Sequence, residues 1–379
     1  MRLLYIANLR LPTEKAYGIQ IAKMCEAFAS QNFDVTLVFP FRQNLIKEDF
    51  FSYYSVNKKF KIKRIWAFDF YFFGQLDKIA VSIKEIISAL LLSFYAITQK
   101  ADVIYSRDEW PLYFLSFFKN NLVFEAHRFS KSRTLFYKRF KSKSFKIVAI
   151  TQHLKDDFIK IGFRPENILV APDGVDLAEF NIDISKDEAR TRVGLPLSGK
   201  IVMYTGHLFE WKGAQTLLQV ARMTNAKGQM SNVLFVFVGG TDYDIAKFRE
   251  KAKGLDNVLI LGHKPHKEIP FFLKSADILI LPNSAKEEIS RSYTSPLKLF
   301  EYMTSKGPIV ASDLPSIREV LNETNSFLVE PDNPNALARG VNKILDDPEL
   351  AKNISNKASQ NVQERTWLKR AETILNFSR

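Results

Sequence analysis

Short apolar runs alternate with segments of helical period along most of this 379-residue chain. The alternation covers residues 1–161 and begins again at residue 201. Such a pattern favours parallel sheets with helices on both faces, so the sequence predicts an α/β fold of two doubly wound, Rossmann-like domains facing a cleft. The predicted strands are residues 3–7, 35–39, 61–67, 103–105, 122–125, 147–150, 201–205, 233–238, 258–262, 278–281 and 309–311, and the predicted helices are residues 19–30, 79–97, 152–161, 214–223, 244–253, 316–321, 335–345 and 348–364.

Turns, charges and prolines interrupt the alternation from Asp173 to about Lys200. Ligands of parallel sheets bind at the carboxyl ends of the strands, and a cleft between two such domains is the default binding site. The predicted organisation is a first domain over residues 1–180, a linker over residues 181–199, a second domain over residues 200–362 and a C-terminal helix over residues 363–379.

The stretch Thr294–Asp313, TSPLKLFEYMTSKGPIVASD, is predicted to form a short helix followed by a buried strand. Ser295 is a good N-cap, and Pro296 suits the first helical position. Lys306-Gly307-Pro308 should end the helix, because glycine tolerates a left-handed cap and proline cannot continue a helix. The free N–H groups and positive dipole at the start of this helix suit a phosphate, and Glu301 on the same helix suits ribose hydroxyls.

The composition fits two globular domains in a reducing compartment. A hydrophobic fraction of 46% is ordinary, and the single cysteine, Cys25, excludes an internal disulfide framework. The N-terminus lacks the apolar run of a signal peptide, and the longest apolar run, Ile86–Ile97, is too short to span a bilayer. We therefore expect a cytoplasmic protein.

Nearly all of the net charge of +13 belongs to the first half of the chain, where residues 1–150 hold 24 Lys and Arg against 12 Asp and Glu. The stretch Arg128–Lys146 carries eight cations, no acid and five interleaved aromatics, Phe129, Phe136, Tyr137, Phe140 and Phe145. A solvated basic helix, a nucleic-acid surface and a membrane surface all fit this charge. We favour an anionic membrane surface, aided by Phe68–Phe73 and the helix 79–97, since no nucleic-acid recognition motif is present.

Other patterns of chemical interest have simpler interpretations. Asp242-Tyr243-Asp244 is a D-x-D sequence, but acids in the first turn of a helix need no metal to explain them. One cysteine and scattered histidines make no zinc set, so no metal site is predicted. The side chains of His153, His263 and His266 are interpreted as structural.

Motifs from both halves together resemble those of family 4 glycosyltransferases. The first half carries PTEKAYGIQIAKMCEAFA, EAHRF, ITQHLKDDF and ILVAPDGVDLAEF, and the second carries GHLFEWKGAQTLLQVA, VFVGG, FFLKSADILILPNS and SPLKLFEYMTSKGPIVASDLPSIREVL. The resemblance covers nearly the whole chain and implies the two-domain GT-B fold. It also implies that residues 1–180 face the acceptor, that residues 200–362 bind a nucleotide-sugar, and that the helix 363–379 crosses back to the first domain.

The activity implied by the resemblance is retaining transfer of a sugar from a UDP- or GDP-linked donor to an acceptor hydroxyl, with no required metal or other cofactor. A basic, aromatic first domain would suit an acceptor carried on a membrane lipid or a growing glycan. The expected setting is polysaccharide or glycolipid assembly by a peripheral protein at the inner face of the membrane.

The resemblance further assigns roles to individual residues. Glu301 would hold the donor ribose, and Lys212 would neutralise the diphosphate of the leaving nucleotide. Gly18 would allow a close approach to the phosphate, and His127 would hydrogen bond the reacting sugar. The predicted catalytic residues are His127, Lys212 and Glu301, and the predicted donor-binding residues are Gly18, His207, Lys212, Gly262, His263, Thr294, Ser295, Pro296, Leu297, Lys298 and Glu301.

Two positions depart from the family pattern. Tyr293 occupies the place of the first glutamate of the E-x7-E motif, with Glu287 and Glu288 as nearby substitutes. His207 stands where the family usually has a basic residue, so the phosphate site would rely on Lys212 with Lys298 or Arg291. These departures favour a second hypothesis, a catalytically weak subunit that binds a nucleotide-sugar.

Overall fold

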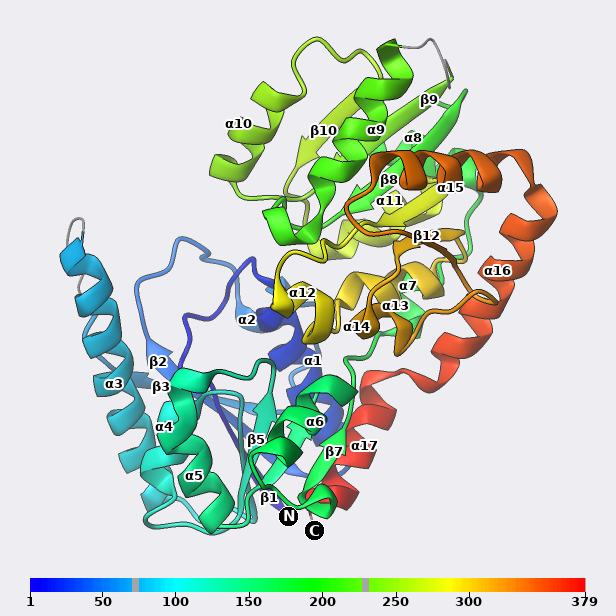
Figure 1. Cartoon of the computed structure of the whole chain (residues 1–379). Helices are drawn as coiled ribbons and strands as arrows, with labels where there is room; N and C mark the ends of the chain where they lie inside the picture. The colour runs from blue at the N-terminus through cyan, green and yellow to red at the C-terminus, as the bar shows by residue number, and fades with distance from the viewer. Residues whose placement is uncertain (70–74, 227–231, 379) are drawn as a thin grey trace. The chain divides into compact units, whose positions relative to one another are not determined.

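The computed structural model describes residues 1–69, 75–226 and 232–378, and the chain folds as two units (Figure 1). The first unit is Met1–Asp173 with Trp367–Arg379, and the second is Gly174–Thr366. Each unit contains one wholly parallel sheet with helices packed on it. The predicted pair of doubly wound, Rossmann-like α/β domains is therefore confirmed.

The first sheet has the strand order β3-β2-β1-β4-β5-β6-β7. The order reverses direction between β1 and β4, and the loops that leave these two strands therefore diverge and leave room for a ligand. The strands are β1 (Arg2–Ile6), β2 (Asp34–Phe41), β3 (Lys61–Trp66), β4 (Val103–Ser106), β5 (Leu122–Ala126), β6 (Lys146–Ala149) and β7 (Ile168–Val170). The helices of this unit are α1 (Ala16–Ser30), α2 (Phe50–Tyr53), α3 (Gln75–Thr98), α4 (Glu109–Leu115), α5 (Thr134–Ser142), α6 (Gln152–Lys160) and α17 (Trp367–Ser378), with 3-10 turns η1 (Lys131–Arg133) and η2 (Pro165–Asn167).

The second sheet has the order β10-β9-β8-β11-β12-β13, with its own reversal between β8 and β11. Its strands are β8 (Lys200–Thr205), β9 (Val233–Val238), β10 (Val258–Gly262), β11 (Ile278–Leu281), β12 (Ile309–Ser312) and β13 (Phe327–Val329). Its helices are α7 (Leu177–Phe180), α8 (Lys186–Val193), α9 (Ala214–Ala226), α10 (Asp242–Lys251), α11 (Ile269–Ser275), α12 (Glu288–Ser292), α13 (Leu297–Thr304), α14 (Pro315–Arg318), α15 (Pro334–Asp346) and α16 (Pro348–Asn361), with 3-10 turns η3 (Glu210–Lys212), η4 (His266–Glu268) and η5 (Val362–Glu364).

The two faces of the second sheet pack into separate hydrophobic clusters. Ile201 and Met203 of β8 belong to one cluster, whereas Val202 and Tyr204 of the same strand belong to the other. Alternate side chains of a strand point to opposite faces, so a strand covered on both faces is apolar throughout. For this reason the strands appear in the sequence as continuous apolar runs and do not alternate between apolar and polar residues.

The region predicted as a linker, residues 181–199, is instead a folded part of the second unit. Helix α8 begins with a capping box of Ser185 and Glu188 and packs against α11. Buried Arg190 pairs with Asp277 at 2.7 Å and donates to the carbonyl of Ser275. The prediction was wrong because a buried ion pair anchors this helix, and hydrophobic periodicity does not reveal such an anchor.

Short elements also escaped the sequence pattern. The edge strands β7 and β13 have three residues each, and α2, α4 and α5 are short helices between predicted elements. The last helix, α17, packs against α1 and belongs to the first unit.

Helix α13 begins and ends differently from the prediction. Pro296, not Ser295, is the N-cap, and no side chain caps the helix. The left-handed residue after the helix is Lys306, with φ of 61°, and not Gly307. A Cβ at Gly307 would lie 2.8 Å from Cδ1 of Leu279, so this glycine allows close packing on β11.

Glycines 213 and 194 offer a matched test of close packing against backbone strain. Both are left-handed, with φ of +72° and +70°, but a Cβ at Gly213 would lie 1.7 Å from the carbonyl oxygen of Pro282, whereas Gly194 has no atom within 4 Å. We expect Gly194→Ala to cost about 1 kcal/mol of stability. Gly213→Ala should cost about 1–3 kcal/mol more because it overpacks the β11 loop. Denaturant unfolding of both variants measures the difference, and equal losses would contradict this account.

Candidate functional site

Two loops leave the neighbouring strands β8 and β11 at their carboxyl ends and are joined to each other. The loop after β8 ends in the turn η3, where the carbonyl of Trp211 accepts hydrogen bonds from Ser284 N and Ser290 Oγ, both at 3.0 Å. Ser284 follows β11, and Ser290 lies on α12. The loop that carries Lys212 is therefore held against the segment that leads into α13.

Helix α13 is tied to the end of β8 by its own side chain. The hydroxyl of Tyr302 lies 2.9 Å from the backbone N–H of Thr205, which donates to it. This bond holds α13 beside the end of the strand, and Thr294 and Pro296, just before the helix, are buried. The N-cap residue Pro296 makes no side-chain hydrogen bond to the first turn, and N–H groups at the start of a helix suit an anion.

Lys298, the second residue of α13, is a buried cation without an acceptor. Its side-chain Nζ makes no hydrogen bond in the described part of the chain and lies 3.8 Å from the ring centroid of Tyr204. Gly206, at the end of β8, leaves space on this side, since a Cβ there would lie 3.8 Å from Nζ. Burial, followed by the positive charge of Lys212, lowers the pKa of Lys298 well below its usual value.

Lys212 is the second lysine predicted to contact the donor phosphates. Its Nζ lies 3.9 Å from the ring centroid of Trp211, and burial lowers its pKa to about 8. Burial disfavours the charge of both lysines, and an anion that binds beside them would stabilise both charges. The predicted residues Lys212 and Lys298 are thus brought into electrostatic contact at the start of α13.

Glu301 makes a contact that sequence reasoning missed. Its Oε1 lies 3.1 Å from Nε2 of His266, and Nδ1 of the same ring lies 3.0 Å from Oε1 of Glu179. Burial opposes a charge on His266, but the hydrogen bonds to the two carboxylates outweigh it and raise its pKa to about 9. His266 is therefore an imidazolium at neutral pH and holds the predicted ribose residue in place. Glu179 is 87 residues from His266, so no local signal could have paired them.

The remaining predicted donor residues of the second unit differ in their burial. His207 is half-buried, and its ring is stacked on that of Phe209 with 4.8 Å between the ring centroids. Gly262 is buried and left-handed, with φ of +72°, and its carbonyl accepts from Gly239 N. His263 is exposed, and Ser295 and Leu297 are half-buried.

The acids near the position of the missing first glutamate are exposed. Glu287 and Glu288 are exposed at the start of α12, and Arg291 on the same helix is exposed as well. Tyr293, which stands at the family's glutamate position, is 6% exposed.

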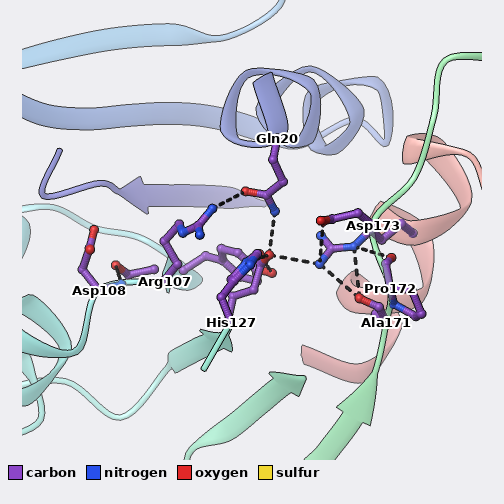
Figure 2. Close-up of polar contacts among 11 residues, drawn as sticks. Gln20, Arg107, Asp108, His127, Ala171, Pro172 and Asp173 are labelled. Atoms are coloured by element: carbon purple, nitrogen blue, oxygen red, sulfur yellow. Dashed lines mark hydrogen bonds and ion pairs between the residues drawn. The ribbon is translucent and has the colours of Figure 1, made fainter. Parts of the chain in front are cut away.

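In the first unit, His127 follows β5 and belongs to a buried polar cluster (Figure 2). Its Nε2 lies 2.7 Å from Oε1 of Glu125, a side chain with no exposed surface. Burial, and then the charge of Arg107, lower the pKa of His127 to about 4, so the ring is neutral at pH 7. Burial works against the charge of Glu125, but Arg370 and His127 outweigh it and lower the pKa of the carboxyl.

Gly18 lies inside the first turn of α1, not in a loop before it. A Cβ at this position would lie 2.1 Å from the hydroxyl of Tyr54, which accepts from Thr13 N at 2.7 Å. Packing against Tyr54 accounts for the glycine without a ligand. Its contact with a phosphate stays a prediction.

The D-x-D sequence forms the first turn of helix α10. Thr241 is the N-cap of α10 and donates its hydroxyl to the carboxylate of Asp244 at 2.6 Å. Among residues 1–69, 75–226 and 232–378, no group of three or more His, Cys, Asp or Glu side chains is placed to hold a metal ion.

The basic stretch Arg128–Lys146 buries most of its aromatic side chains. Phe136, Tyr137, Phe140 and Phe145 are at most 6% exposed and pack in the core of the first unit. The expectation that they face a membrane was wrong, because α5 is amphipathic: Phe136 packs on α4 and Phe140 packs on Phe124 of β5. Most of Phe68–Phe73 lies outside the described residues.

Helix α3 carries the more exposed apolar surface of this unit. Ile83, Leu90 and Phe94 are 46%, 46% and 72% exposed on it, and Phe117 and Phe118, which follow α4, are 53% and 67% exposed. Helices α3 and α4 pack against each other (Figure 1). Contrary to the estimate from the sequence, Ala80–Thr98 is long and apolar enough to span a membrane by length and composition, although 39% of that stretch is buried within the protein.

Family comparisons match both halves of the chain. Residues 185–361 match the family described as "Glycosyl transferases group 1", and residues 18–179 match the family described as "Glycosyltransferase Family 4". An uncharacterized glycosyltransferase of Methanocaldococcus jannaschii is 25% identical over 62% of this chain and 60% of its own length. The alpha-D-kanosaminyltransferase of Streptomyces kanamyceticus is 29% identical over 48% of this chain and 45% of its own length. The chain thus spans about half of these relatives.

Solved structures match over nearly the full chain. HepE of Anabaena, in complex with UDP and glucose, is 17% identical with a TM-score of 0.74, covering 99% of this chain and 98% of HepE. Sucrose-phosphate synthase of Thermosynechococcus elongatus is 17% identical with a TM-score of 0.76, covering 99% and 97%. At this identity the similarity establishes the GT-B fold.

The charged state of His266 predicts a pH dependence of stability. Its pKa is about 9 in the folded protein against an ordinary 6.5, so the stabilisation is complete below pH 6.5 and is lost as the pH rises through 9. The stability difference between wild type and His266→Gln should therefore shrink by about 3 kcal/mol between pH 6.5 and 9. Denaturant unfolding across this range measures it. His263→Gln, which removes an exposed histidine of the same loop, should track the wild type; a difference that is constant with pH would contradict the ion pair.

Proposed function

Each half of this chain matches a glycosyltransferase family along almost its whole length, and on that premise we propose that the protein is a retaining glycosyltransferase. It moves a sugar from a nucleotide-sugar to an acceptor hydroxyl. The donor is UDP- or GDP-linked, and HepE, solved with UDP-glucose, supports a donor of this class. No metal or other cofactor is required.

One observation carries the proposal: the buried, unpartnered Nζ of Lys298 at the start of α13, with Lys212 close to it. A buried ammonium without an acceptor is costly, and the uncapped first turn of a helix adds N–H donors and a positive dipole. A nucleotide diphosphate supplies the missing acceptors. As the nucleotide leaves, negative charge develops on it, and these fixed cations stabilise that charge.

Glu301 is the ribose ligand in this proposal. Its Oε1 is held by His266, while Oε2 makes no hydrogen bond in the described part of the chain. A carboxylate oxygen accepts only, so Oε2 is suited to the hydroxyl of a ribose. The nucleotide is thus held at its phosphates by the two lysines and at its ribose by a carboxylate of the same helix.

The transfer itself needs no protein nucleophile. The acceptor hydroxyl attacks the anomeric carbon from the side that the nucleotide leaves, and the leaving phosphate takes the hydroxyl proton. Neutral His127 contributes a hydrogen bond on the sugar side. Gly18, Gly262 and His263 complete the donor contacts.

The acceptor is proposed to be a glycan or a lipid-linked sugar at a membrane surface, in polysaccharide or glycolipid assembly. The exposed apolar side chains of α3 and of the segment after α4 would contact lipid, and the exposed cations of Arg128–Lys146 would contact anionic headgroups. The protein would then be cytoplasmic and peripheral at the inner face. Nucleic acid is not a proposed partner.

A second candidate function is a catalytically weak subunit that binds a nucleotide-sugar. Buried Tyr293 at the first glutamate position favours it, since a tyrosine does not supply the carboxylate that the family motif has there. Screening UDP- and GDP-sugars for binding and for hydrolysis or transfer separates the two candidates. Binding without turnover on any acceptor would favour the weak subunit.

Replacing Lys298 tests the phosphate site. Lys298→Met removes the charge at similar volume, and the loss of a charged hydrogen-bond donor should weaken UDP or GDP binding by about 10–100-fold. Lys212→Met should act in the same direction. Calorimetry measures the affinity, and turnover of the donor found in the screen should fall with it. Lys286→Met, an exposed lysine after β11, serves as the control; nucleotide affinity that is equal in all three variants would exclude this site.

The membrane proposal is tested by flotation with vesicles. We expect the wild type to float with vesicles containing anionic lipid at low salt, but not with neutral vesicles. Phe94→Ser with Phe118→Ser should reduce the bound fraction several-fold. Leu197→Ser replaces a leucine of the second unit that is 59% exposed and should bind as the wild type does. Wild-type protein that stays unbound to anionic vesicles would remove the proposal.

A further inference from the structure

Four hydrogen-bond donors from distant parts of the first unit converge on the carboxylate of Glu125 (Figure 2). Nε2 of Gln20 on α1 lies 2.6 Å from Oε1, and Nη2 of Arg370 on α17 lies 3.0 Å from the same oxygen. His127 and the hydroxyl of Tyr105 on β4 also bond this carboxylate. A fully buried carboxyl with four donors is stable as a carboxylate, which can only accept.

Arg370 is the cation that lies against Glu125, and it comes from the last helix of the chain. The side chain is 6% exposed, and it is fixed at the end of β7 because it donates to the carbonyls of Ala171 and Pro172. Its Nη2 also lies 3.9 Å from the carboxylate of Asp173. These contacts hold the guanidinium in a fixed position, in which it hydrogen bonds the carboxylate of Glu125.

The bond between Glu125 and His127 selects one form of the ring. Since the carboxylate only accepts, Nε2 of His127 must carry a hydrogen, and a neutral ring then has its lone pair on Nδ1. Within the described part of the chain, Nδ1 makes no hydrogen bond. His127 is thus prepared to accept a hydrogen bond from a hydroxyl through Nδ1.

We propose that Arg370 is a positioning residue: by holding Glu125 as a carboxylate, it fixes His127 in the Nε2–H form and leaves Nδ1 to accept a hydroxyl of the sugar or acceptor. The inference rests on the proposed transfer function for the identity of that hydroxyl. The state of the ring itself depends only on the contacts within the first unit.

The charged groups around this pair determine what happens when Arg370 is removed. Arg107 at the end of β4 and Arg370 on α17 oppose a positive charge on His127, whereas Glu125 favours one. Tyr5 on β1 and Cys25 on α1 also face Glu125, and burial raises the pKa of each, so both stay neutral. Asp173, the other carboxyl beside Arg370, has its pKa raised to about 7 by burial. Without Arg370, the buried carboxylate loses the cation that hydrogen bonds it, and His127, at 2.7 Å, is the neighbouring group that can take a proton.

Nitrogen NMR of the full chain with labelled histidines measures the ring directly, with His127→Gln used to assign its signals. We expect the wild-type ring to be in the Nε2–H form and neutral down to about pH 5. Arg370→Met should raise the pKa of His127 by at least one unit, and Arg370→Lys, which keeps the charge, should restore most of the wild-type value. An Nδ1–H form in the wild type, or an unchanged titration in folded Arg370→Met, overturns the proposal.

Glu125→Gln decides the question if Arg370→Met does not fold. An amide can donate as well as accept, so this variant would no longer require a hydrogen on Nε2 of His127, and the Nδ1–H form should appear. A ring that keeps only the Nε2–H form contradicts the inference.

Turnover completes the test. With the donor found by screening, Arg370→Met should lower kcat by about 10–100-fold at nearly unchanged KM for the nucleotide-sugar, since Lys212, Lys298 and Glu301, which are proposed to hold the nucleotide, belong to the second unit. Arg370→Lys should recover part of kcat, and Lys369→Met, an exposed lysine on the same helix, should match the wild type. A parallel loss in Arg370→Lys and Arg370→Met means a merely structural role. A wild type without transfer or hydrolysis of any donor refutes the proposed function, while the NMR result still decides the state of His127.

Discussion

Charge buried at the carboxyl ends of parallel strands is the constraint on which both candidate sites depend. A buried ion must have partners, because the low-dielectric interior does not supply them as water does. In the first unit the chain provides the partners of one buried carboxylate: Glu125 receives four donors, one of them from Arg370 on the last helix. In the second unit Nζ of Lys298 lies over the ring of Tyr204 but has no hydrogen-bond acceptor among the described residues. The carboxylate of Glu125 is thus satisfied within the chain, whereas the acceptor proposed for Lys298 is a bound anion.

The two units reach these arrangements through the same topology. Each sheet reverses its strand order once, at β1 and β4 or at β8 and β11, and the chemically active side chains follow those strands or their neighbours. Helix α13 is held to β8 by Tyr302, and His127 follows β5 directly. A rigid sheet places short loops with little freedom, so cations and carboxylates that come from different loops keep fixed separations.

Much of the fold was predictable because hydrophobic periodicity is local. The buried strands of both sheets were found as apolar runs, and α13 was found from its apolar face and the proline after it. Elements without such a signal were missed: β7 and β13 are three-residue edge strands, and α8 is anchored by the ion pair of Arg190 with Asp277. The interleaved aromatics of Arg128–Lys146 led to the wrong prediction that these rings are exposed. A sequence of alternating cations and rings does not show which face of a helix is buried.

Patterns local in the chain were enough to predict the class of fold, the order of most elements and Lys212, Lys298 and Glu301 as candidate residues. Which charges are buried, and which groups they contact, became visible in the folded chain. His266 holds Glu301 together with Glu179, which is 87 residues away, and Arg370 holds Glu125, which is 245 residues away. The physical reason is that secondary structure follows from neighbours along the chain, whereas the partner of a buried charge is chosen by packing between segments that are remote in sequence.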